Sequence, residues 1–257
     1  MPHNTLRQLV GTTRSVRSNR HLGLLLAFVA GAINAGGFLA IQRYTSHMSG
    51  IVSGVVDDLV LGNITLAIAG VLMVLTFVAG AMTTAILTNW ARLRRLHSEY
   101  ALSLLLESAL LLLFGLLGTY LATYTTLLLP ATAALLCFIM GLQNAIITKM
   151  SQAEIRTTHM TGVITDLGIE LGKLFYWNRS RATIDPGYVR ANRDKLKIHA
   201  WLLGCFLGGG LSGALAFKFM SYAATVPFAV LLAALAIVPV FDDIRQALRS
   251  ARQRPGA

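Results

Sequence analysis

Six stretches of the sequence are long and apolar enough to cross a lipid bilayer. A membrane-spanning helix needs about 20 consecutive, mainly apolar residues. Six segments meet this requirement: 22–42, 64–88, 101–124, 127–148, 200–221 and 223–241. Because backbone polar groups inside lipid must be satisfied within the segment, we expect each of them to be a helix. The sequence therefore predicts an all-α polytopic membrane protein with six transmembrane helices.

The composition supports this class of protein. Of the 257 residues, 55% are hydrophobic and 13% are charged, whereas soluble domains carry about 25% charged residues. This balance excludes an ordinary soluble domain, and it also excludes a disordered chain. Cys137 and Cys205 lie far apart in apolar runs, so they indicate neither a disulfide framework nor a zinc site.

The basic residues indicate how the chain is oriented. The net charge is +11, from 22 Lys and Arg against 11 Asp and Glu. With six spans, every basic residue except Arg43 and Lys218 falls on the side that holds both termini, the 89–99 loop and the 149–199 segment. The positive-inside rule makes this side cytoplasmic. The positive charge is thus explained by topology and lipid headgroups, and nucleic acid is not expected as a partner.

A six-residue motif occurs twice in the chain. Thr45–Gly50 and Thr157–Gly162 both read T-x-H-M-x-G. Residues before and after the motif repeat as well, in the same order. Gly31, Asn34 and Ala35 correspond to Gly141, Asn144 and Ala145, and Phe77, Gly80 and Ala85 correspond to Phe206, Gly209 and Ala214. The sequence therefore predicts a duplicated unit.

Each unit contains three spans, and three is an odd number. The second unit must then enter the membrane upside down, which gives two inverted three-helix repeats. The predicted organisation is a basic cytoplasmic tail, a first repeat, a second repeat with the cytoplasmic loop 178–199, and a second basic tail. Their ranges are 1–21, 22–124, 127–241 and 242–257.

A short amphipathic segment follows each histidine motif. Segments 48–61 and 160–177 carry apolar residues at helical spacing and acidic residues on another face. Both are too short to span comfortably, so we expect an interfacial or a re-entrant helix in each repeat.

Small residues recur every fourth position in two spans and form a glycine cluster in a third, and they predict close helix packing. The stripes are Ala27, Gly31 and Ala35; Ala133, Cys137, Gly141 and Ala145; and Gly204, Gly208, Gly209 and Gly213.

The two histidine motifs are the first candidate site. Thr or Ser can cap a helix, Gly permits unusual backbone angles, and His exchanges a proton near neutral pH. A break between helices can also hold a substrate or an ion. The candidate substrate or gating residues are Thr45, His47, Ser49, Gly50, Thr157, His159, Thr161 and Gly162. The alternative is that both histidines only satisfy backbone groups or lipid headgroups.

Three polar residues within the spans extend this list. Glu107 is the only acidic residue well inside a span, and a buried carboxylate often marks a proton or ion path. Snorkelling of Glu107 toward the cytoplasmic surface is the alternative. Asn34 and Asn144, like Gln143, either line a cavity or form interhelical hydrogen bonds.

Signatures of catalysis are missing from the sequence. It contains no G-x-S-x-G, H-E-x-x-H, Walker or Rossmann motif. We therefore predict no catalytic residue, no bound metal and no cofactor, and we do not expect an enzyme. An intramembrane enzyme would require the two histidines to lie within about 5 Å of each other or of a shared carboxylate.

Four features of the sequence resemble the YoaK-like bacterial membrane proteins, a family classed as a domain of unknown function. They are the Gly- and Ala-rich first span, the motif after it, the Gly-rich stretch 206–213 and the second motif before an amphipathic helix. The resemblance covers roughly residues 20–241. It implies a polytopic protein of the bacterial inner membrane with no assigned substrate, and it identifies no functional residues.

The function that we predict is that of a transporter or permease for a small solute, with the two motifs as paired gates. Its partners would be the lipid bilayer and an unidentified small solute, and a homo-oligomer is compatible with the sequence. The alternative function is a non-transporting membrane scaffold or sensor, whose loop 178–199 docks a cytoplasmic protein.

Overall fold

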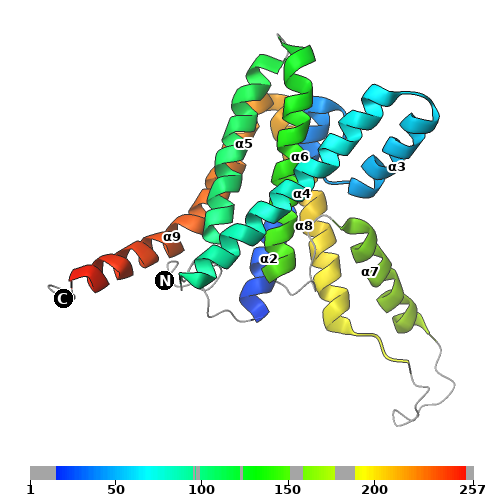
Figure 1. Cartoon of the computed structure of the whole chain (residues 1–257). Helices are drawn as coiled ribbons and strands as arrows, with labels where there is room; N and C mark the ends of the chain where they lie inside the picture. Colours follow the sequence, from blue (N-terminus) through cyan, green and yellow to red (C-terminus); the bar gives the residue numbers. More distant parts are fainter. Residues whose placement is uncertain are drawn as a thin grey trace.

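The computed structural model consists of helices, and it contains no strand within the residues that it describes (Figure 1). These residues are 16–94, 96, 99–121, 124–150, 159–176 and 189–252. The helices are α2 (Val16–Ile41), α3 (Met48–Val60), α4 (Ile64–Leu93), α5 (Ala101–Leu121), α6 (Thr125–Met150), α7 (Met160–Phe175), α8 (Arg193–Met220), the 3₁₀ turn η1 (Ser221–Ala224) and α9 (Thr225–Arg252).

Five helical stretches are long and apolar enough to cross a membrane. They are Arg20–Ile41, Ile64–Leu93, Ala101–Leu121, Leu128–Met150 and Arg193–Ile237. The last stretch contains α8, η1 and much of α9, and the chain reverses at η1, where Ser221 has a φ of 51°. Figure 1 shows that consecutive long helices run in opposite directions. Several long apolar helices make this an integral membrane protein.

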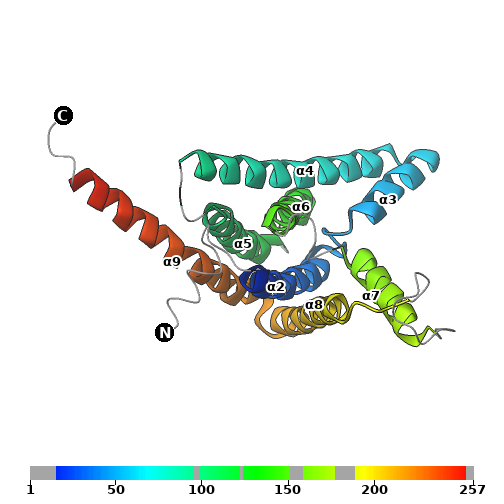
Figure 2. The same ribbon diagram turned by 90° about the horizontal axis from the view of Figure 1, so that it is seen from below.

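The core lies between α4 and α8. Figure 2 places α2, α5 and α6 in the middle, with α4 and α8 on opposite sides of them. Leu26, Phe114 and Ile146 are completely buried in this core. The outer face of α4 is instead apolar and exposed, as at Leu75 and Ile86. Such a surface is suited to lipid tails.

Two glycines let α2 approach α8 and α6 approach α4. A methyl group on Gly31 would collide with the backbone carbonyl of Phe206, and one on Gly141 would collide with that of Phe77. The sequence repeat pairs these same residues, Gly31 with Gly141 and Phe206 with Phe77. The two contacts therefore match each other.

The glycines on the partner helices, α8 and α4, form a second pair of matching contacts. A methyl group on Gly209 would collide with the backbone of Phe28, and one on Gly80 would collide with the backbone of Phe138. Each helix pair is thus held together by a glycine from both partners. Close backbone approach of this kind increases van der Waals contact, which drives helix association in membranes.

A third pair is formed by α5 and α9, near the turn η1. Gly115 contacts Thr225, Gly118 contacts the Tyr222 ring, and the Ser108 hydroxyl donates a hydrogen bond of 2.8 Å to the carbonyl of Ala229. The small residues of α5 again face its partner.

The prediction for the glycines of α8 was partly wrong. Gly209 and Gly213 do pack against α2, but Gly204 and Gly208 have no atom within 4 Å of where a Cβ would lie. Each of these two glycines precedes a contacting glycine by an odd offset, Gly208 by one residue and Gly204 by five, which rotates it about 100° or more around the helix and off the contact face of α8.

Three predicted boundaries differ from the observed helices. Arg193–His199 was predicted as part of a loop but forms the first two turns of α8, and α9 extends into the predicted C-terminal tail to Arg252. The predicted N-terminal tail likewise ends in helix, from Val16. Hydropathy marks where an apolar segment ends, whereas a helix continues through polar residues outside the hydrocarbon. The start of α8 has its own signal, since the Asn192 side chain accepts hydrogen bonds from the backbone NH groups of Asp194 and Lys195.

Candidate functional site

The two histidine motifs form matching helix starts. His47 is the N-cap of α3 and His159 is the N-cap of α7, with φ/ψ of −92°/68° and −82°/56°. Their backbone carbonyls accept the first helical hydrogen bonds, at 3.1 Å from Ile51 and 3.2 Å from Val163. Neither side chain caps its helix. The histidine side chains are therefore not used to satisfy the helix ends, which was one of the alternatives.

The glycine at the end of each motif makes room for the histidine ring. A methyl group on Gly50 would collide with the ring of His47, and one on Gly162 would collide with the ring of His159. Each ring thus lies over the first turn of its own helix, and both side chains are exposed. This contact explains the spacing of His and Gly in the motif.

α3 and α7 begin close to each other and then diverge. In Figures 1 and 2 both helices start beside the central bundle, and α3 runs along its upper part while α7 runs along its lower part. α3 packs on α4, where Gly70 contacts Val55, and α7 packs on α8. With 13 and 16 residues, both helices are shorter than a span.

The connection from α2 to α3 is fixed to α2. The Ser46 hydroxyl donates a 2.7 Å hydrogen bond to the side-chain carbonyl of Asn34, and Tyr44 stacks on Phe38 with 4.6 Å between ring centroids. Thr45 is 1% exposed and its hydroxyl has no hydrogen-bond partner. The equivalent connection before α7 contains Thr157 and lies outside the described residues.

Two cavities border this connection. One, of about 300 Å³, lies between α3 and α4, and its polar lining comes from Arg43, Tyr44, His47 and Asp58. The other, of about 370 Å³, lies between α2 and α8, and Asn34 and Tyr44 are among its lining residues. Tyr44 therefore lines both cavities, and each of them is also bordered by a predicted site residue.

Three further predicted site residues, Ser49, Thr161 and Asn144, lie outside the connection from α2 to α3. Ser49 and Thr161 are exposed on the first turns of α3 and α7. The Asn144 side chain donates a 2.8 Å hydrogen bond to the carbonyl of Met140 in its own helix. Arg43, Tyr44 and Ser46 were missed as site residues, since no motif marks them and only the folded loop brings them together.

Glu107 is buried in the centre of the bundle, between α5 and α6. Its carboxylate accepts a 2.8 Å hydrogen bond from the side-chain amide of Gln143, and both side chains are 0% exposed. Snorkelling, the alternative for Glu107, is therefore wrong. The interhelical hydrogen bond expected for Gln143 is confirmed.

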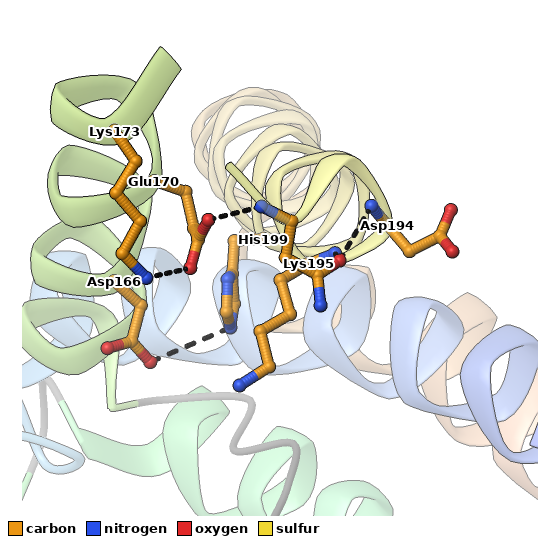
Figure 3. A network of polar contacts seen from close by, with 7 residues as sticks. Asp166, Glu170, Lys173, Asp194, Lys195 and His199 are labelled. Atoms are coloured by element: carbon orange, nitrogen blue, oxygen red, sulfur yellow. Dashed lines mark hydrogen bonds and ion pairs between the residues drawn. The ribbon is translucent and has the colours of Figure 1, made fainter. Parts of the chain in front are cut away.

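A polar network joins the end of α7 to the start of α8 (Figure 3). The Glu170 carboxylate accepts hydrogen bonds of 2.8 Å from the Lys173 ammonium and 2.6 Å from the backbone NH of Asn192. The bond from Lys173, more than any other contact, lowers the pKa of Glu170 below its ordinary value. His199 lies 3.7 Å from Asp166 in the same network. An acidic face on segment 160–177 was predicted from the sequence, but its contacts with Asn192 and His199 were not.

This network gives a pH-dependent stability. The charged form of Glu170 is the stabilising one, so its contribution is complete above pH 4.5, the ordinary pKa, and is lost as the pH falls through the lowered pKa. We expect Glu170→Gln to lower the melting temperature of the detergent-solubilised protein by a few degrees at pH 7. The difference from wild type should disappear in acid. A difference that is independent of pH would contradict this role of the charge.

No group of three or more His, Cys, Asp or Glu in the described part of the chain is arranged to hold a metal ion.

Comparison with curated proteins and with solved structures finds no match. The family model of a protein of unknown function, DUF1275, matches residues 22–238, from the first turns of α2 into α9. The chain therefore belongs to the DUF1275 family, whose function is unknown.

Proposed function

We propose that this protein is a transporter or permease for a small solute, built from two inverted three-span repeats. The observation that carries the proposal is the matched packing of α2 on α8 and of α6 on α4. Gly31 and Gly141 contact Phe206 and Phe77, which are themselves repeat partners. Two equivalent halves that exchange conformations would open one pathway first to one side of the membrane and then to the other.

Six spans fit this proposal, with α8 and α9 crossing separately on either side of η1. Both termini would then lie in the cytoplasm of a bacterium, together with most of the basic residues. The reversal at Ser221 and the opposite directions of consecutive long helices support this count. The exposed apolar surface of α4 is consistent with a protein surrounded by lipid.

In this proposal α3 and α7 are re-entrant helices that act as paired gates. They enter the membrane from opposite sides and begin near each other, with a histidine at each start. Two cavities lie next to the start of α3; Arg43 and His47 border the first, and Tyr44 borders both. The N-termini of helices favour negative charge, so two that begin near each other would influence which solutes pass.

The test compares small solutes in cells that lack the protein and in cells that overproduce it. We expect at least one solute to differ between them, inside the cells or in the medium. Gly50→Leu combined with Gly162→Leu should remove most of this difference at equal abundance in the membrane, because the added side chains displace both histidine rings.

Matched controls lie on α7. Gly168→Leu combined with Gly172→Leu adds the same two side chains where no atom lies within 4 Å of the Cβ position, so this variant should keep the difference. Transport would be contradicted if no solute differed while deletion of residues 178–188, which leaves α8 and its cap in place, still changed the phenotype. That outcome would favour the scaffold or sensor.

A further inference from the structure

Three buried oxygen atoms at and near Glu107, here called the Glu107 cluster, have no hydrogen-bond partner among the residues that the structure describes. They are Oε2 of Glu107, Oε1 of Gln143 and Oγ of Ser103. Ser103 precedes Glu107 by one turn of α5, and all three side chains are 0% exposed. Each of these oxygens can accept a hydrogen bond, and only the Ser103 hydroxyl can also donate one, so the unpartnered atoms offer more acceptors than donors.

No positive charge among the described side chains compensates the carboxylate. Among the side chains that the structure describes, the amide of Gln143 is the only group that acts on Glu107. Arg92 of α4 pairs with Glu99, and Lys149 of α6 binds Asn89. On η1, Tyr222 packs against Gly118, about three turns along α5 from Glu107.

Protonation of Glu107 would remove both the excess of hydrogen-bond acceptors and the uncompensated negative charge. A proton on Oε2 forms an O–H bond, removes the buried negative charge and converts an acceptor into a donor for which unused acceptors exist in the cluster. An ionised carboxylate without a cationic partner is costly in such surroundings. The cluster is therefore built for a neutral carboxylic acid, and a charge would require access to water.

The hydrogen bond between Glu107 and Gln143 joins the two repeats, so a movement of one repeat relative to the other would affect it. Glu107 belongs to the first repeat and Gln143 to the second, so their hydrogen bond crosses from one half of the chain to the other. The repeat position equivalent to Gln143 is the buried Ile33. The equivalent helix of the first repeat, α2, therefore packs without an amide at this position, so packing alone does not explain Gln143.

We infer that Glu107 is the proton-binding site that couples solute transport to proton movement. This inference rests on the proposed function. The carboxyl group holds a proton while the two halves enclose it, and it releases the proton to water when the halves separate around Gln143. Solute and proton then cross in the same cycle.

The first experiment is infrared spectroscopy of the full-length protein in lipid vesicles, which needs no solute. Wild type should show the C=O stretching band of a protonated carboxylic acid at pH 7, and Glu107→Gln should lack this band. If wild type shows no such band at pH 7, the inference is overturned, whereas the transport proposal is unaffected.

The second experiment adds a protonophore to cells that overproduce the protein. Glu107→Gln should show only a small solute difference, because its amide cannot exchange a proton. With the protonophore, the solute difference of wild type should fall to this level, and the difference in Glu107→Gln should not change. A wild-type difference that is insensitive to the protonophore would overturn proton coupling alone. If no solute differs in any strain, the proposed function fails first, and this inference fails with it.

Discussion

Alanine at Gly31 or Gly141 is expected to destabilise the protein severely. A Cβ at either position would collide with the backbone carbonyl of a neighbouring helix, which cannot rotate away as a side chain can. Overpacking of this kind costs about 1–3 kcal/mol or more. Because the two contacts match, both variants should lose a similar amount of stability. The measurement is the temperature at which the detergent-solubilised protein stops eluting as a single species in size-exclusion chromatography.

Gly208→Ala is the control for this experiment. It makes the same change in α8, where nothing lies within 4 Å of the Cβ position. Alanine is favoured over glycine in a helix by about 1 kcal/mol, so this variant should be as stable as wild type or slightly more stable. The packing of the two halves would be contradicted if Gly31→Ala or Gly141→Ala behaved like Gly208→Ala.

Much of the fold could be predicted from the sequence, because the bilayer imposes a length and a composition on each span. The six apolar stretches fall closely on α2, α4, α5, α6, α8 and α9, and the segments after the motifs are α3 and α7. The helix ends were less accurate. The first turns of α8 are polar, and only the cap at Asn192 marks their beginning.

The candidate site was predicted only in part. The repeated motif identified His47, His159 and their glycines, because a duplicated pattern is visible in one sequence. The contact between ring and glycine was not predicted, since it depends on side-chain rotamers. The Glu107–Gln143 pair was also out of reach, because it joins two helices at positions that have no common spacing and Gln143 is not repeated in the first half.

Opposite orientation of the two repeats is the central claim, and it can be tested at two equivalent places. Asn63 follows α3 and Tyr176 follows α7, and both side chains are exposed. If the repeats are inverted, these positions lie on opposite sides of the membrane. Two parallel repeats would place them on the same side.

The most direct measurement is therefore the labelling of single cysteines at these positions. Asn63→Cys and Tyr176→Cys are made in a chain that carries Cys137→Ala and Cys205→Ala, so that no other thiol reacts. A maleimide that cannot cross the membrane should label position 63 in intact cells, and it should label position 176 only after the inner membrane is opened. Labelling of both positions in intact cells, or of neither, would contradict the inverted arrangement.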